Sequence, residues 1–213
     1  MTDEELIGQN MVLDNGLILF KPEIICHPNV PRPLHGVAPR VIKGTGWWNK
    51  IRKKVYLKYD FHCGACGVHQ SRAKRFQRLE AHEFYEVDHY HGIVRVKSLE
   101  PLCNYCHSFI HTGRMINTLS TKQGMGRKTA IAVLNHGFRL CVENDLKCYI
   151  GAIEAAEVLR VELPDGLKWY EPVENENLKW SDWKMIFDGE EHPARFHSQE
   201  EWANHYELED YEE

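Results

Sequence analysis

LEPLCNYCHSFIHTGR, residues 99–114, places two cysteines and two histidines within nine positions. Its C-x-x-C pair has a counterpart in CGACG, residues 63–67. Zinc prefers four tetrahedral thiolate or imidazole ligands, and a C-x-x-C pair folds into a tight turn that presents two sulfurs to one ion. The two pairs therefore predict one structural zinc site, formed by Cys63, Cys66, Cys103 and Cys106.

The two histidines of the same stretch are left for a second metal site. His107 and His111 are four residues apart, so on a helix beginning near Asn104 their side chains stack on one face. Two imidazoles placed in this way can converge on a single ion. The stretch thus predicts two separate metal sites rather than one.

Length and composition indicate a folded protein without a membrane segment. The 213 residues, 43% of them hydrophobic, can bury one sizeable core. The N-terminus has no basic region followed by an apolar run, and no segment approaches the roughly 20 apolar residues of a membrane span. Seven cysteines, four of them in C-x-x-C pairs, fit a reducing compartment. We therefore expect a cytoplasmic, intracellular protein that is not secreted and has no membrane partner.

The net charge of −5 conceals an uneven distribution. Residues 40–80 carry eleven lysines and arginines against two acids, whereas residues 200–213 carry seven acids and no lysine or arginine. The first segment contains an amphipathic helix near residues 45–63, in which Trp48, Ile51 and Val55 recur at helical spacing opposite a row of lysines. Such a basic face is either an ordinary solvated surface or a contact for a polyanion. The candidate nucleic-acid-binding residues are Lys50, Lys53, Lys54, Lys58, Arg72, Lys74, Arg75 and Arg78.

Prolines, periodicity and turn residues divide the chain into four regions. Residues 1–42 hold five of the nine prolines and are expected to form an extended Pro-rich arm with one strand near GLILF, residues 16–20. Residues 43–115 contain the metal motifs, and residues 116–163 contain predicted helices at 127–143 and 151–162. Residues 164–213 are tryptophan-rich, with a hairpin turn at Asp188-Gly189, a helix capped by Ser198 and an acidic tail. Four residues without ligand spacing are interpreted as core residues: Cys26, Cys141, Cys148 and His136.

The segment between the two cysteine pairs predicts a β-hairpin. LEAHEFYEV (79–87) and IVRVKSL (93–99) have strand character, the polar turn DHYHG (88–92) joins them, and the helix with both histidines follows. This order of strand, strand and histidine-bearing helix resembles the HNH nucleases, also called the His-Me finger or ββα-metal family, in their zinc-ribbon-bearing form. The resemblance covers roughly residues 46–114. It implies an α+β fold: a small zinc-stapled ββα-metal core with flanking helices and a C-terminal hairpin region.

The resemblance also implies a metal-dependent endonuclease that hydrolyses phosphodiester bonds of nucleic acid, with DNA as the expected partner. In this family the first strand supplies a metal ligand and then a histidine that deprotonates the attacking water, and the helix supplies the other ligands. Carried onto this sequence, the ligands are His82, His107 and His111, and Glu83 stands where the basic histidine is usual. The implied cofactors are a structural zinc ion and a catalytic divalent ion, which is magnesium, manganese, nickel or zinc.

Glu83 leaves three assignments of the base open. Glu83 is the base; or Glu83 and His82 exchange roles, with the carboxylate on the metal; or Asp88 and His89 in the turn form the catalytic pair. Strand alternation places His82 and Glu83 on opposite faces unless the strand bulges there, whereas His82, Glu86 and Asp88 share a face. A fourth reading is a degenerate site in a non-catalytic zinc-stabilised module that binds nucleic acid or protein. A further alternative assigns the function to the tryptophan-rich C-terminal region.

Overall fold

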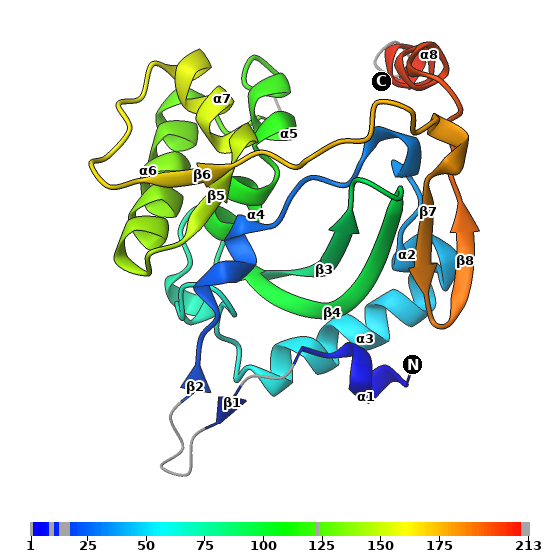
Figure 1. The fold of residues 1–213 in the computed structure, drawn as a ribbon. Coiled ribbons are helices and arrows are strands. Elements are labelled where there is room, and N and C mark those ends of the chain that lie inside the picture. The colour runs from blue at the N-terminus through cyan, green and yellow to red at the C-terminus, as the bar shows by residue number, and fades with distance from the viewer. Residues whose placement is uncertain (1, 9–10, 13–17, 122–123, 210–213) are drawn as a thin grey trace.

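Helices and strands are grouped around one long β-hairpin (Figure 1). The computed structural model describes residues 2–8, 11–12, 18–121 and 124–209. The strands are β1 (Met11–Val12), β2 (Ile18–Leu19), β3 (Leu79–Asp88), β4 (Ile93–Cys103), β5 (Lys147–Tyr149), β6 (Lys168–Tyr170), β7 (Lys184–Phe187) and β8 (Glu190–Pro193). The α-helices are α1 (Asp3–Leu6), α2 (Pro39–Ile42), α3 (Gly44–Lys58), α4 (Asn104–Ile110), α5 (Thr112–Asn117), α6 (Arg127–Glu143), α7 (Ile150–Leu159) and α8 (Gln199–Glu209). The 3₁₀ turns within the described residues are η1 (Pro22–Cys26), η2 (Arg32–Leu34), η3 (Gln70–Arg72) and η4 (Trp180–Asp182).

The antiparallel hairpin β3–β4 is the centre of the fold. Its register runs from Leu79 opposite Cys103 to Asp88 opposite Ile93, and it shifts once, between Phe84 and Tyr85. The sequence predicts this hairpin with a second strand that ends at residue 99, but β4 continues to Cys103 and passes directly into α4. This extension brings the first turn of α4 next to the beginning of β3.

Strands β7 and β8 extend the same sheet in the order β3-β4-β7-β8. Asp188 and Gly189 between them have φ angles of 56° and 80°, as the two central residues of a type I′ turn require. The hairpin predicted at Asp188-Gly189 is therefore confirmed. Strand β7 also pairs with β4 in parallel, with Ile93 opposite Lys184, a long-range contact that no local pattern predicts.

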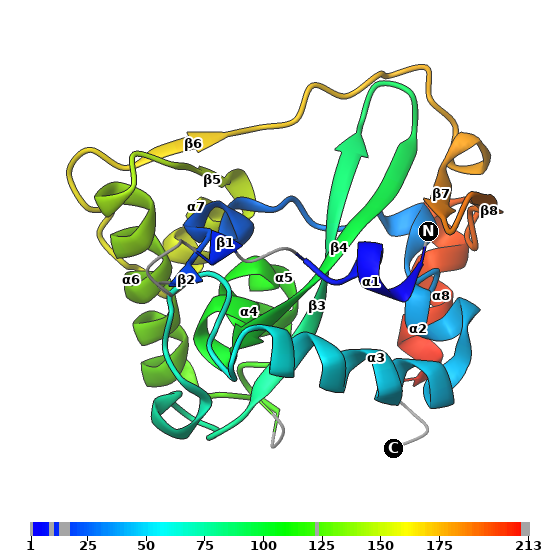
Figure 2. The same ribbon diagram turned by 90° about the horizontal axis from the view of Figure 1, so that it is seen from below.

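Helix α3 packs against the hairpin (Figure 2). It ends at Lys58, short of the predicted residue 63, because Asp60 and Phe61 have φ angles of 45° and 56° and cannot continue a helix. On its inner side Ile51 and Val55 are completely buried in a core shared with β3, β4 and β7. The predicted amphipathic helix is thus present, and its apolar stripe fixes the position of the hairpin.

The helices predicted at 127–143 and 151–162 are confirmed as α6 and α7, although α7 ends earlier, at Leu159. They lie close to α4 and α5 and enclose a second core (Figure 1). Helix α6 approaches α4 closely at Gly137, where an added Cβ would lie 2.1 Å from the ring of Phe109. This close packing makes α6 the support of the helix that carries the metal motifs.

The described part of residues 1–42 is not the extended arm that the sequence predicts. Its prolines begin the short helices η1, η2 and α2, because a proline is well tolerated in the first helical turn. Ile7, Ile25 and Leu34 are at most 2% exposed, so this region completes both cores. Of the strand predicted near residues 16–20, β2 covers Ile18–Leu19, and residues 16 and 17 lie outside the described residues.

At the other end, α8 follows Ser198, whose hydroxyl accepts the Glu201 N–H at 3.1 Å as the predicted cap requires. The Glu201 carboxylate accepts the N–H of His197 rather than that of Ser198, so the capping box is shifted by one residue. Among the described helices, none has the length and apolar character needed to cross a membrane.

Candidate metal centres

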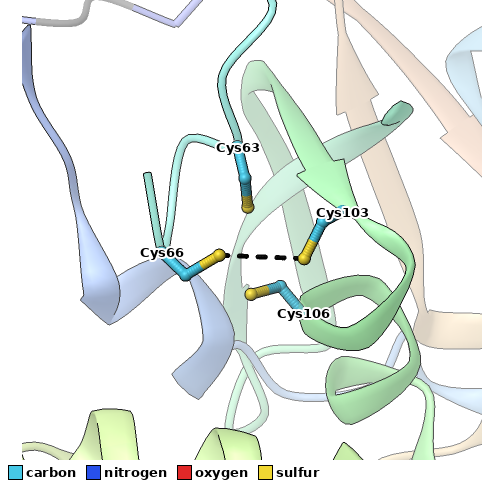
Figure 3. Close-up of side chains that lie close together, drawn as sticks. All are labelled: Cys63, Cys66, Cys103 and Cys106. Atoms are coloured by element: carbon cyan, nitrogen blue, oxygen red, sulfur yellow. Dashed lines mark hydrogen bonds between the residues drawn. The ribbon is translucent and has the colours of Figure 1, made fainter. Parts of the chain in front are cut away.

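Four cysteine sulfurs meet where the turn after α3 lies against the β4–α4 junction (Figure 3). All four sulfurs lie within 4.8 Å of one another, and those of Cys66 and Cys103 are 3.7 Å apart. A tetrahedron with zinc–sulfur bonds of about 2.3 Å has edges of about 3.8 Å. The predicted set of four, Cys63, Cys66, Cys103 and Cys106, can therefore hold a metal ion such as zinc.

The turn that carries Cys63 and Cys66 is held by backbone hydrogen bonds. The Gly67 N–H donates to the Cys63 carbonyl at 2.9 Å, and the Gly64 N–H donates to the Pro101 carbonyl at 2.7 Å. Gly67 has a φ of 69°, and a Cβ at this position would lie 2.6 Å from the Phe20 ring. A glycine is needed there, and the bond to Pro101 ties the first cysteine pair to the strand that carries the second.

The thiols of this cluster influence one another. Hydrogen bonding with Cys103 lowers the pKa of Cys66, whereas burial raises the pKa of Cys63. Thiols whose pKa is raised in this way remain protonated when no ion is bound. Binding of zinc therefore releases protons and weakens as the pH falls.

His136, predicted as an ordinary core residue, contacts the cysteine cluster. Its Nε2 lies 3.3 Å from the Cys106 sulfur, and Arg139 lies 3.5 Å from its Nδ1. Because Arg139 can only donate, Nδ1 accepts and the ring proton is on Nε2, directed at the sulfur. His136 is thus hydrogen-bonded and not one of the converging ligands, as predicted, and the partner of its Nε2 is a candidate zinc ligand.

Three histidines form a second cluster close to the first. His82 comes from β3, His107 from α4, and His111 from the junction of α4 and α5. Their ring centroids are 5.3 Å apart for His82 and His107, 5.1 Å for His82 and His111, and 4.7 Å for His107 and His111. One ring nitrogen of each lies within 4.8 Å of the others. The three predicted ligands are thus brought together, with the difference that α4 ends at Ile110, one residue before His111.

Burial keeps two of these imidazoles neutral. It lowers the pKa of His82 and of His111 well below the usual value of 6.5. His82 is 3% exposed, and its Nε2 has no hydrogen-bond partner within the described part of the chain. Neutral imidazoles with an unpaired nitrogen are the form that binds metal ions.

Glu80 orients the third imidazole. Its Oε2 lies 3.0 Å from His107 Nδ1, and its Oε1 accepts a hydrogen bond from Asn104 Nδ2 at 3.0 Å. The bond with His107 lowers the pKa of Glu80 to about 2, so the carboxylate is charged. It therefore fixes the proton of His107 on Nδ1 and leaves Nε2 for a metal ion. Glu80 is not among the site residues predicted from the sequence, although its position two residues before His82 places both on one face of β3.

Glu83 does not join the histidines in a group of converging ligand atoms. It pairs with Leu99 and, by strand alternation, shares a face with Tyr85, which packs in the core beside α3. Burial raises the pKa of Glu83, and the charges of Arg40 and His107 oppose that rise. The register shift lies one residue further on, between Phe84 and Tyr85, and so does not bring both side chains to the α4 side.

Asp88 and His89, the third possible catalytic pair, lie at the far end of the hairpin. The Asp88 carboxylate accepts the N–H groups of Tyr90 and His91 at 3.2 and 3.0 Å and contacts His91 Nδ1 at 2.8 Å. His89 packs against Trp183. Six residues of strand span about 20 Å, so the structure does not bring this pair to the three histidines. The Asp88 carboxylate therefore stabilises the turn of the hairpin.

The basic candidates fall into two groups. On α3, Lys54 pairs with Asp3 and Glu4 at 3.4 and 3.7 Å, which neutralises part of that face. The second group lies in the loop between the cysteine turn and β3. The guanidinium groups of Arg75 and Arg78 lie 4.8 and 4.7 Å from the centre of the Phe76 ring. The ammonium group of Lys74 lies 5.6 Å from the centre of the Tyr105 ring in α4. The basic loop, as we call it, comprises Lys74, Arg75 and Arg78, and Lys74 contacts the helix of the histidine cluster.

A fourth histidine, His27, lies beside the cluster and was not anticipated. It is 4% exposed, its ring centroid is 5.5 Å from that of His82, and its Nε2 accepts the Tyr85 N–H at 2.8 Å. Burial lowers the pKa of His27 to about 4, so the ring is neutral. It follows η1, in the region that the sequence analysis takes for an arm outside the metal-binding region, and no motif marks it.

Fold and site together define an α+β chain with four cysteines that can hold an ion such as zinc and, adjacent to them along α4, three converging histidines. Comparisons of the chain with protein-family models, with curated proteins and with solved structures find no match. The function is therefore argued from the geometry and chemistry of these two clusters.

Proposed function

We propose that this protein is a metal-dependent endonuclease of the HNH type, which hydrolyses phosphodiester bonds of nucleic acid, DNA above all. The observation that carries the proposal is the convergence of His82, His107 and His111 where a β-hairpin meets a helix. Three protein ligands leave coordination positions open for water and substrate, as catalytic metal sites do. The neighbouring four cysteines would supply a closed, structural site.

The donor set narrows the choice of ion. Three imidazoles suit zinc or nickel better than magnesium, which prefers oxygen ligands. The ligand residues fit such an ion because burial keeps His82 and His111 neutral and Glu80 directs the free nitrogen of His107 toward them. When bound, the ion would stabilise the charge on the phosphate and on the departing 3′ oxygen.

The chain's own residues supply the other parts of the reaction. We take Glu83 as the general base because it follows His82 directly in the sequence, although its side chain is on the other face of β3 from the histidines. Its raised pKa makes this carboxylate a better proton acceptor near neutral pH than an exposed one. Arg40, close enough to oppose that rise, is positioned to attract a phosphate. The basic loop would hold the nucleic-acid backbone without reading its sequence.

A nicking assay tests the proposal. Supercoiled plasmid is incubated with the zinc-loaded protein and added nickel, manganese, zinc or magnesium, with and without a chelator. We expect nicking with at least one ion, loss of nicking in a His107→Ala, His111→Ala variant that keeps about one zinc per chain, and a loss of about a hundredfold or more in Glu83→Gln. Glu86→Gln, an exposed carboxylate on the same strand paired with Lys97, is the matched control and should cut normally. Absence of nicking with every ion would refute the proposal.

The second candidate is a non-catalytic module that a zinc ion stabilises and that binds nucleic acid or protein. The position of Glu83 favours it, because this residue replaces a histidine and shares a face with Tyr85 rather than with the three imidazoles. The two candidates differ in one measurement. The module would bind plasmid with unchanged affinity after the double histidine substitution and would leave the plasmid intact with every ion.

A further inference from the structure

His27 occupies the one place where the ladder of the central hairpin is interrupted. The pairing of β3 with β4 shifts between Phe84 and Tyr85, and the Tyr85 N–H at this shift donates to His27 Nε2 at 2.8 Å. The His27 ring also lies 5.4 Å, centroid to centroid, from the rings of both Phe84 and Tyr85. The His27 side chain, which lies outside the sheet, thus accepts a backbone N–H of the central hairpin.

The hydrogen bond determines the form of the His27 ring. Because Nε2 accepts, it carries no proton, and the proton of the neutral ring is on Nδ1. This N–H group is buried without a hydrogen bond of normal geometry, and the backbone of Pro28 is the polar group that acts on the ring. A phenylalanine or leucine would fill the same volume but would leave the buried Tyr85 N–H without an acceptor, so the imidazole has a role beyond packing.

His82 supplies the explanation. The His27 and His82 rings meet edge to face, with centroids 5.5 Å apart and an interplanar angle of 84°. The Nε2 of His82, which has no hydrogen-bond partner in the described part of the chain, therefore lies in the same buried region as the His27 ring. The 3₁₀ turn η1, which delivers His27, also packs against α4, the helix of His107. One residue thus contacts the strand ligand and is carried by an element that touches the helix of the other ligands.

We propose that His27 is a positioning residue of the histidine metal centre: it pins the interrupted strand through the Tyr85 N–H and holds the His82 imidazole toward His107 and His111. The inference rests on the proposed function only in requiring that these three histidines bind an ion. It assigns part of the N-terminal region to the metal centre, and it explains why a polar ring is buried there.

The experiment compares two substitutions at one position. In His27→Gln the amide oxygen can still accept the Tyr85 N–H, whereas His27→Phe keeps an aromatic ring but removes the acceptor. Co²⁺ is titrated into the zinc-loaded full-length protein, and its absorption spectrum distinguishes imidazole from thiolate ligation. His35→Phe is the matched control, because His35 is another hydrogen-bonded imidazole of the same region and its Nδ1 contacts Trp202 of α8 instead.

We expect His27→Phe to bind Co²⁺ at the histidine centre on the order of 10- to 100-fold more weakly, as is usual when an outer-shell partner of a metal ligand is lost. His27→Gln should stay within about threefold of the parent, because its amide oxygen can still accept the Tyr85 N–H and hold the strand that carries His82. The His35→Phe control should be unchanged, and every variant should retain one cysteine-bound zinc.

Several results would overturn the inference. Parent-like affinity in His27→Phe would show that His82 needs no such support. Equal losses in His27→Gln and His27→Phe would exclude the hydrogen bond as the cause, and loss of the cysteine-bound zinc together with the fold in His27→Phe would make His27 a residue of the core. If the parent itself binds no ion at the histidines, the metal centre fails, and the role of His27 fails with it.

Discussion

The hydrogen bond between Glu80 and His107 makes the sharpest prediction about the metal centre. Substituting Glu80 by alanine removes the acceptor that lies 3.0 Å from His107 Nδ1, so the ring loses its fixed tautomer and can rotate. Loss of such a partner commonly weakens metal binding by about 10- to 100-fold, which corresponds to about 1.4–2.8 kcal/mol. Glu80→Gln keeps an oxygen for the bond but loses the charge that makes the imidazole a stronger donor to the metal, so its loss should be smaller.

Isothermal titration of Ni²⁺ into zinc-loaded protein measures this loss directly. Asn104, which donates to the same carboxylate at 3.0 Å, gives a second variant, because Asn104→Ala should weaken binding less than Glu80→Ala does. The control is again Glu86→Gln, whose partner Lys97 lies on the exposed side of the hairpin. Unchanged affinity in Glu80→Ala would refute the reasoning, since it would show that metal binding does not depend on the bond between Glu80 and His107.

Three further outcomes follow from single contacts. Gly137→Ala should lower the free energy of unfolding in urea by about 1–3 kcal/mol, because its Cβ would overlap the Phe109 ring, whereas Gly113→Ala meets no atom within 4 Å and should not be destabilising by this route. Burial lowers the pKa of His35 from 6.5, so below pH 6.5 the unfolded chain takes up a proton at this residue that the folded chain does not. The parent should therefore lose stability relative to His35→Gln as the pH falls from 6.5 through the lowered pKa. A stability difference that does not change with pH would contradict this. Replacing Lys74, Arg75 and Arg78 of the basic loop by glutamine should weaken binding to DNA of any sequence. The slope of the logarithm of affinity against the logarithm of salt concentration should become less steep by up to about 2.7. An unchanged slope would place the interface elsewhere.

Local spacing was sufficient to predict the cysteine cluster and two of the three candidate histidine ligands, whereas His82 was predicted from the family resemblance. Cys63 and Cys66 share one turn, and His107 and His111 share one helical face, because backbone geometry over three or four residues fixes where such side chains point. The same holds for the Asp188-Gly189 turn and for helix α6, whose patterns are complete within a few residues. For these elements the sequence by itself determined the outcome.

The partners of those ligands were decided by the tertiary structure alone. His27 reaches His82, and His136 reaches Cys106, only because the apolar faces of η1 and α6 pack against α4. The parallel pairing of β7 with β4 and the burial of Ile7 and Leu34 likewise join segments far apart in the chain. Burial of apolar surface is non-directional, so a sequence shows which residues will be buried but not which of them will meet. Most of the candidate metal ligands could therefore be predicted from local sequence, whereas the residues that contact them depend on how the separate elements pack.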